Sequence, residues 1–185
     1  MWWVQLLNSI VALLGNGAAA GGDYESIATV TAAGGETSIT FSSIPSTYQH
    51  LQIRFTSNAG TNDNYMRFNS DTGTNYIWHN LYGDGASAAA YTPGTGQTKV
   101  SAGYGSTNAS STYSGAAVCD ILDYANTNKY KTTRSLSGFD ENGSGYVLLH
   151  SGLWLNTAAI STIVIFPNSG SIKANSKFAL YGLKG

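Results

Sequence analysis

From Tyr24 to the C-terminus, apolar and polar residues alternate with a period of two in a series of short segments. In one of them, Leu51, Ile53 and Phe55 are separated by single polar residues. Because successive side chains of a strand point to opposite faces, this alternation is typical of strands with one buried face. The pattern predicts strands at residues 38–41, 51–56, 66–69, 76–82, 98–103, 116–122, 132–139, 145–155, 160–166 and 177–183.

Gly, Asn, Asp and Pro residues separate these segments and predict turns between them. No segment after Tyr24 sustains a helical period. Eight or more short strands over about 160 residues predict an all-β fold, an antiparallel β-sandwich, and two four-stranded sheets of jelly-roll type suit this size. Five apolar residues are expected to fill the space between the sheets: Trp154, Ile163, Ile165, Phe178 and Leu180.

The segment 86–114 is rich in Gly, Ser, Thr and Ala, and outside the short strand at 98–103 it predicts a surface loop. Tyr91, Tyr104 and Tyr113 are spaced through it. Tyrosine supplies a large contact area at a low entropic cost, so these three side chains are also candidates for an exposed recognition loop. The surface loop without a binding role is the favoured interpretation of the two.

The first fourteen residues are the most hydrophobic part of the chain. No Lys or Arg precedes this run, which argues against a signal peptide, and it is too short for a membrane span of about 20 residues. Read as a helix, it has one narrow polar face. The large apolar residues predict an anchor or oligomerisation element: Trp2, Trp3, Leu6, Leu7, Ile10, Val11, Leu13 and Leu14. A helix that packs on its own core is the alternative.

Residues 15–22 are rich in Gly and Ala and predict a flexible tether. The chain therefore divides into an N-terminal anchor helix with its tether, 1–22, and a β-sandwich domain, 23–185.

Only 10% of the 185 residues are charged, against about 25% in ordinary domains, and the net charge is −1. These values exclude a disordered chain and argue against a nucleic-acid binder. A surface with few charges repels other molecules only weakly, so we expect partners to cover part of it. The alternative is a secreted, sugar-binding or merely polar β-protein.

Sequence signatures of catalysis are missing: the chain has neither a Gly-x-Ser-x-Gly motif nor a P-loop. Asp120 and Asp123, three apart on a predicted strand, are expected on opposite faces rather than as a catalytic pair. Cys119, the one cysteine, predicts a buried thiol. The three histidines lie in or directly beside predicted strands, without metal-ligand spacing, and predict a structural role: His50, His79 and His150. We therefore expect no enzyme, no cofactor and no metal site.

Four motifs, in order along the chain, resemble a group of structural proteins of tailed bacteriophages. They are Thr-Phe-Ser-Ser-Ile-Pro at 40–45 with Tyr-Gln-His-Leu at 48–51, then the segments 67–76, 152–163 and 176–182. Within the second, Asn-Ser-Asp-Thr-Gly at 69–73 lacks the acidic residue that closes a calcium loop, and predicts a tight turn with Gly73 at positive φ. The resemblance implies jelly-roll β-sandwiches that act as capsid decoration (cement) proteins or as tips of tail and neck fibres, commonly as trimers. The N-terminal segment is not part of the resemblance.

We therefore expect a virion protein on the capsid exterior that binds the major capsid protein, or another virion protein, non-covalently across subunits, as a homotrimer. The alternative is a neck- or tail-attached fibre head domain that binds host surface glycans. A third hypothesis is a free lectin-like module outside any virion. Nucleic acid and membrane-spanning contacts are not expected. Hundreds of copies per particle would indicate cement, and a dozen or fewer an appendage.

Overall fold

A computed structural model describes residues 23–110 and 112–185. The predicted N-terminal helix, its anchor side chains and its tether lie outside these residues. The described residues form twelve strands and no helix: β1 Tyr24–Thr31, β2 Ile39–Phe41, β3 His50–Ser57, β4 Asp63–Phe68, β5 Tyr76–Gly83, β6 Ala88–Tyr91, β7 Val100–Tyr104, β8 Gly115–Leu122, β9 Lys131–Asp140, β10 Gly145–Trp154, β11 Ile163–Pro167 and β12 Lys177–Leu183.

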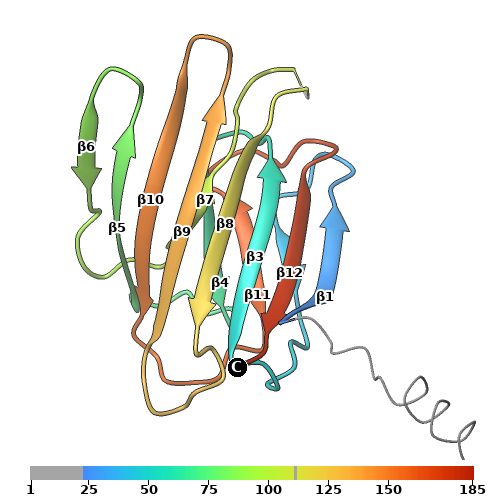
Figure 1. The fold of residues 1–185 in the computed structure, drawn as a ribbon, viewed down its shortest axis with the longest axis vertical. Coiled ribbons are helices and arrows are strands. Elements are labelled where there is room, and N and C mark those ends of the chain that lie inside the picture. The colour runs from blue at the N-terminus through green and yellow to red at the C-terminus, as the bar shows by residue number, and fades with distance from the viewer. Residues whose placement is uncertain (1–22, 111) are drawn as a thin grey trace, which may run out of the picture.

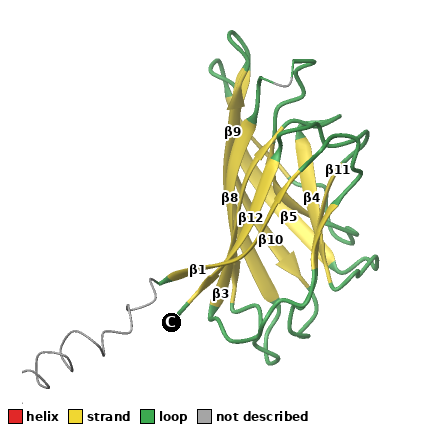
Figure 2. Ribbon diagram, turned by 90° about the vertical axis from the view of Figure 1, so that its right-hand side faces the viewer, coloured by secondary structure: helices red, strands yellow, loops and turns green. Residues whose placement is uncertain are grey.

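The strands form two antiparallel sheets that face each other, which confirms the predicted all-β sandwich (Figures 1 and 2). One sheet has the order β1-β12-β3-β8-β9-β10-β5-β6, and the other has the order β2-β11-β4-β7. The expectation of four strands in each sheet is therefore wrong for the first sheet. The hairpins β9-β10 and β5-β6 pair with each other through β10 and β5 and widen this sheet to eight strands.

The core fills the space between the two sheets, as the alternating pattern predicts. Ile53 on β3 is fully buried, whereas its neighbour Arg54 is exposed. Burial of one large apolar side chain stabilises a fold by about 1.5–3 kcal/mol, so these inward positions supply most of the driving force. All five residues predicted between the sheets are at most 1% exposed: Trp154, Ile163, Ile165, Phe178 and Leu180.

Each strand predicted by alternation is present, with its bounds shifted by a few residues. The prediction of loop around β6 is wrong, because Ala88–Tyr91 pairs with β5 at the edge of the large sheet. Its sequence, Ala-Ala-Ala-Tyr, contains no alternation because both of its faces are largely exposed. Only the backbone pairing with β5 makes it a strand.

The turn at residues 69–73 is closed by the carboxylate of Asp71. Its Oδ1 accepts the backbone N–H of Gly73 at 2.8 Å, and its Oδ2 accepts Trp154 Nε1 at 2.7 Å. The prediction of positive φ at Gly73 is wrong, and Asn69 and Ser70 have this conformation instead, with φ of 49° and 57°. Glycine at 73 is favoured by space: a Cβ atom there would lie 2.8 Å from Nδ2 of Asn75. Asp71 also accepts a hydrogen bond from Asn75, directly before β5, so its carboxylate links the start of β5 to Trp154 at the end of β10.

The large sheet is wider than the sheet that faces it. The edge strand β7 of the small sheet packs against β8, β9, β10 and β5. In Figure 1, β5 and β6 lie at the left-hand edge, to the side of the strands of the small sheet. The inner face of the β5-β6 hairpin therefore extends past the small sheet, and its side chains can meet a ligand.

Candidate functional site

A cleft with a volume of about 430 Å³ lies between the inner face of this overhang and the edge of the small sheet. Six of its ten lining residues are aromatic, and three of the others carry polar groups. Ligand sites in proteins are commonly hollows in which aromatic side chains and a few placed polar groups meet. The lining residues are Asn62, Asp63, Tyr65, Trp78, Asn80, Tyr82, Tyr91, Tyr104, Tyr146 and Leu148.

Strand periodicity places one wall of the cleft. Trp78, Asn80 and Tyr82 occupy alternate positions of β5, so all three side chains point to the inner face. Cross-strand pairing adds neighbours on both sides: Asn80 lies opposite Tyr91 of β6, and Tyr82 lies opposite Leu148 of β10. The opposite wall comes from β4 and β7 of the small sheet.

Trp78 forms the centre of an aromatic series across the cleft. Its ring centroid lies 6.1 Å from that of Tyr65 on β4 and 5.6 Å from that of Tyr91 on β6, both in tilted arrangements. Trp78 and Tyr65 are buried, at 4% and 7% exposure, whereas Tyr91 is 53% exposed. The series thus has a fixed floor and one ring that presents its surface to solvent.

A second aromatic group surrounds Tyr146 near the start of β10. The centroids of Tyr82 and Tyr104 lie 6.0 and 6.5 Å from that of Tyr146. Phe139 of β9 packs on Tyr146 from the other side, at 5.7 Å. Tyr146 is itself 36% exposed, so this group also offers an accessible ring supported by neighbours.

Asp63 is the charged residue that lines the cleft. Burial raises the pKa of the Tyr65 and Tyr104 hydroxyls, and the nearby Asp63 carboxylate raises both further. Both phenols therefore stay neutral and can donate hydrogen bonds. No Lys or Arg is among the described residues that line the cleft. Beside the lining, the Lys99 ammonium lies 3.8 Å from the ring centroid of Tyr65 and donates a hydrogen bond to Asn168. The site thus combines aromatic faces with one lining carboxylate and a cation next to it.

The floor of the cleft contains buried polar atoms that lack a hydrogen-bond partner in the described part of the chain. They include Nε1 of Trp78 and Oδ1 of Asn80, both from lining residues, and Nδ1 of His150. Buried polar groups are nearly always hydrogen-bonded, and one left unpaired costs about 1–3 kcal/mol. The lining residues thus contribute one unpaired donor and one unpaired acceptor, both buried.

His150 lies beneath the aromatic rings, opposite Asn80 in the strand register. Its ring centroid is 5.8 Å from that of Tyr104 and 6.4 Å from that of Trp78, and its Nε2 lies 3.4 Å from Oγ of Ser137. Burial lowers the pKa of His150 to about 4. The imidazole is consequently neutral at pH 7, and it supports the floor without adding a charge.

The three tyrosines singled out in the sequence have different positions. Tyr91 on β6 and Tyr104 on β7 both line the cleft, although they come from different sheets. Tyr113 lies in the segment between β7 and β8, where its backbone carbonyl accepts a hydrogen bond from Nδ2 of Asn58 at 2.9 Å, and it does not line the cleft. The structure thus brings two of the three together.

Sequence reasoning missed most of the cleft. Trp78, Tyr82 and Tyr146 belong to predicted strands and Tyr65 directly precedes one; none of the four was singled out as a binding residue. A signal was present in β5, where residues 78, 80 and 82 place an aromatic, an amide and an aromatic side chain on one face. From the sequence alone this face is indistinguishable from a face buried in the core, because the pattern does not show that the four-stranded sheet is too narrow to cover it.

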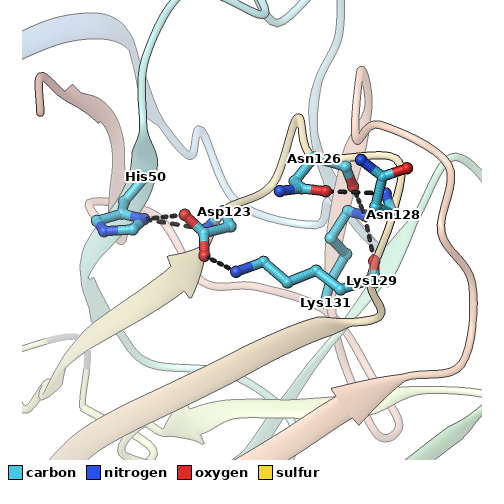
Figure 3. A network of polar contacts seen from close by, with 6 residues as sticks. All are labelled: His50, Asp123, Asn126, Asn128, Lys129 and Lys131. Carbon is cyan, nitrogen blue, oxygen red and sulfur yellow. Dashed lines mark hydrogen bonds and ion pairs between the residues drawn. The ribbon is translucent and has the colours of Figure 1, made fainter.

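A separate polar cluster lies at the other end of the sandwich, around the β8-β9 loop (Figure 3). The backbone N–H of Asp123 donates to Nδ1 of His50 at 2.9 Å, and the Asp123 carboxylate forms an ion pair with Lys129. The hydrogen bond from Lys129 is the main reason that the pKa of Asp123 is lowered. His50 thus stabilises a loop, which fits the structural role predicted for it.

Lys131, in the same cluster, is fully buried. Its Nζ donates to the backbone carbonyl oxygens of Lys129 and Thr157, each at 2.9 Å, and to that of Asn126. Desolvation lowers the pKa of Lys131. The ammonium group joins the β8-β9 loop to the β10-β11 loop, and its donors are occupied by the protein.

The other predicted residues have ordinary surroundings. Asp120 accepts a hydrogen bond from Gln52 at 2.7 Å and pairs with Arg134 at 3.1 Å, far from the partners of Asp123. Cys119 is buried, as predicted, and burial raises the pKa of its thiol. Within residues 23–110 and 112–185, no three His, Cys, Asp or Glu side chains gather closely enough to hold a metal ion. The same residues contain no helix long and apolar enough to cross a membrane.

No protein-family model matches the chain, and no curated protein matches it.

Proposed function

We propose that this protein is a carbohydrate-binding module and that its aromatic cleft holds the sugar. The observation that carries the proposal is the combination of exposed, supported aromatic rings with the unpaired Nε1 of Trp78 and Oδ1 of Asn80 in one cleft. Pyranose rings have apolar C–H faces and a rim of hydroxyl groups. Tyr91 and Tyr146 offer flat surfaces for the faces, and the polar groups of the lining residues Asn62 and Asp63 offer partners for the hydroxyls.

The charge of the cleft favours an uncharged sugar. The Asp63 carboxylate can accept hydrogen bonds from sugar hydroxyls, and no cation lines the cleft among the described residues. An anionic sugar such as a sialic or uronic acid would place a second negative charge beside Asp63, and the neighbouring Lys99 ammonium already donates to Asn168. Like charges in a partly desolvated site repel, so neutral hexoses and N-acetylhexosamines are the expected class.

The proposal includes a jelly-roll topology for the sandwich. When the hairpins β5-β6 and β9-β10 are set aside, the remaining eight strands can be numbered in chain order. The large sheet then has the order 1-8-3-6 and the small sheet 2-7-4-5, the arrangement of paired Greek keys in a jelly roll. In this interpretation the two extra hairpins are insertions that build the cleft on a common scaffold.

The resemblance of four motifs to structural proteins of tailed bacteriophages supports a virion location. A glycan-binding cleft fits the head domain of a neck or tail appendage, which meets the host surface. Capsid decoration is the second candidate, and the observation that favours it is the apolar sequence of residues 1–14. Its partner would be the major capsid protein. Copy number on an intact particle distinguishes the two, because cement requires hundreds of copies.

The proposal predicts that the full chain binds a neutral glycan and that Tyr91→Ala weakens binding at least tenfold. A tenfold loss corresponds to about 1.4 kcal/mol, which is ordinary for an aromatic residue at the centre of a contact. A glycan array identifies the ligand, and titration calorimetry measures its affinity. Tyr130→Ala is the matched control, because Tyr130 is 51% exposed, like Tyr91, but lies in the β8-β9 loop, outside the cleft.

Tyr113→Ala is a second control and is expected to bind as the wild type does, because Tyr113 lies outside the cleft. Two results contradict the proposal. One is the absence of glycan binding by the full chain on the array and in titration. The other is binding of a quaternary ammonium compound such as choline, lost in Tyr91→Ala, without glycan binding; aromatic rings around a carboxylate can also hold such cations.

A further inference from the structure

The outer face of the large sheet carries an apolar surface on the reverse side of the strands that build the cleft. We call it the outer apolar face. It consists of two successive rows of outward positions on β6, β5, β10, β9 and β8, matched by the strand register. One row is Ala90, Leu81, Leu149, Leu136 and Val118, and the other is Ala88, Gly83, Val147, Gly138 and Ala116.

None of these ten positions has a polar side chain, and the large ones are well exposed. Val147 is 65% exposed, Leu136 is 58% and Leu81 is 56%. Together with Leu149 and Val118, they form a contiguous group of five exposed apolar side chains, and an apolar patch of about 300–600 Å² on a single chain is often functional. The alternation that normally puts polar residues on the outer face of a sheet is absent here.

The outer apolar face has clear limits. The next outward row on the same strands is polar and contains His79, Ser151, Arg134 and Asp120. On the β3 side, Arg54 lies opposite Val118. The apolar side chains are therefore a bounded patch within a polar surface, which is the anatomy of a protein interface with an apolar centre and a polar rim.

The shape of this face, with small and large side chains next to one another, favours a second sheet as its partner. Its glycine and alanine positions lie beside larger side chains, and a hollow of about 290 Å³ opens over Gly83 between Leu81 and Val147. Leucine and valine side chains from an equivalent face could enter such a hollow, as they do where two sheets pack about 10 Å apart. A copy of the same face offers this complement, and the absence of charge in both rows removes repulsion between copies.

We propose that the outer apolar face packs against the same face of a second copy of this chain. A specific interface buries at least about 1,000 Å² in total, so the polar rim around the ten positions takes part in the contact as well. The contact is isologous, because each copy supplies the same rows. This inference is independent of the proposed sugar binding, since it uses the opposite side of the strands.

Sedimentation velocity of the full chain tests the proposal, with Leu136→Lys as the decisive variant. The wild type is expected to be dimeric, and Leu136→Lys to raise the dissociation constant of the dimer at least tenfold. Leu136 is exposed in the single chain, so lysine there does not disturb the core. Ser151→Lys, one row below on β10, is the matched control and should stay dimeric. Circular dichroism confirms that each variant is folded.

Three outcomes would overturn the proposal. The first is a wild type that is monomeric at every accessible concentration. The second is a dimer or trimer that Leu136→Lys leaves intact, because the self-contact would then lie elsewhere. The third involves Ile10→Lys in the N-terminal segment of the full chain. If this change abolishes association as completely as Leu136→Lys does, residues 1–14 cover the face in place of a second sheet.

Discussion

At the scale of single residues, His150 shows how burial fixes a charge state at the floor of the cleft. It is 2% exposed, packs between aromatic rings, and has a pKa lowered to about 4 by desolvation. A histidine in the unfolded chain has a pKa near 6.5. The folded state therefore excludes a proton that the unfolded state binds between these two values.

This difference predicts a pH-dependent stability. Because the unfolded state binds more protons, the free energy of unfolding falls as the pH is lowered from 6.5 towards 4, by about 3 kcal/mol from this group. His150→Phe removes the titrating group and should flatten the profile by that amount. Urea unfolding across this pH range measures the free energy of unfolding of the wild type and of His150→Phe. Equal slopes for the two would contradict the assignment.

At the scale of elements, Lys131 fastens two loops at the end of the sandwich away from the cleft. Lys131→Met keeps the aliphatic stem but leaves three carbonyl oxygens without their donor. Hydrogen bonds to charged groups contribute about 1.5–3 kcal/mol, so we expect a loss of about 2–3 kcal/mol in the free energy of unfolding.

Lys129→Met is the control for this prediction. Its side chain is 54% exposed and its ion pair with Asp123 is worth less than about 1 kcal/mol, as is usual at a surface. Its backbone carbonyl, which accepts from Lys131, is unchanged. Denaturant unfolding measures both variants. Similar losses for the two would show that the buried position of Lys131 adds nothing.

The elements also show how far the sequence alone leads. Alternation located the strands that have one buried face, such as β3 and β11, because burial on one side imprints a period of two. It did not locate β6, whose faces are both largely exposed, and it gave no bounds for β1, whose side chains are all at least partly exposed. The number of strands in each sheet depends on pairings between distant segments, which a local pattern does not record.

The residues of the cleft also divide into those that the sequence pattern revealed and those that only the pairing of distant strands reveals. Tyr91 and Tyr104 were noticeable because they interrupt a stretch of small residues, whereas Trp78 and Tyr146 resemble core residues of their strands. What converts a core face into a binding face is the overhang of β5 and β6 beyond β7. This is a property of two sheets of unequal width, and no segment of the sequence contains it.

At the scale of the whole molecule, the hairpins β5-β6 and β9-β10 contribute to a different surface on each side of the large sheet. Their inner face lines the aromatic cleft, and their outer face forms most of the outer apolar face. If copies pair through the outer apolar face, the clefts lie on opposite sides of the dimer. Each dimer would then present two sugar sites directed away from each other.

This arrangement predicts cross-linking. The full chain should agglutinate beads coated with its glycan, because each dimer can bridge two beads. Leu136→Lys should bind the free glycan with unchanged affinity and fail to agglutinate. Turbidity of the bead suspension, together with calorimetry of the free sugar, measures the two effects separately. Agglutination by Leu136→Lys equal to that of the wild type would contradict the joint arrangement.

The buried thiol of Cys119 has a practical consequence for such experiments. It is the only cysteine of the chain, it is fully buried in the core, and burial raises its pKa. Alkylating reagents react with exposed thiolates, so at neutral pH they spare this residue. A cysteine placed at an exposed site, such as Ser169→Cys in the turn after β11, becomes the single reactive thiol. The natural sequence is therefore already a background for attaching one fluorophore per chain.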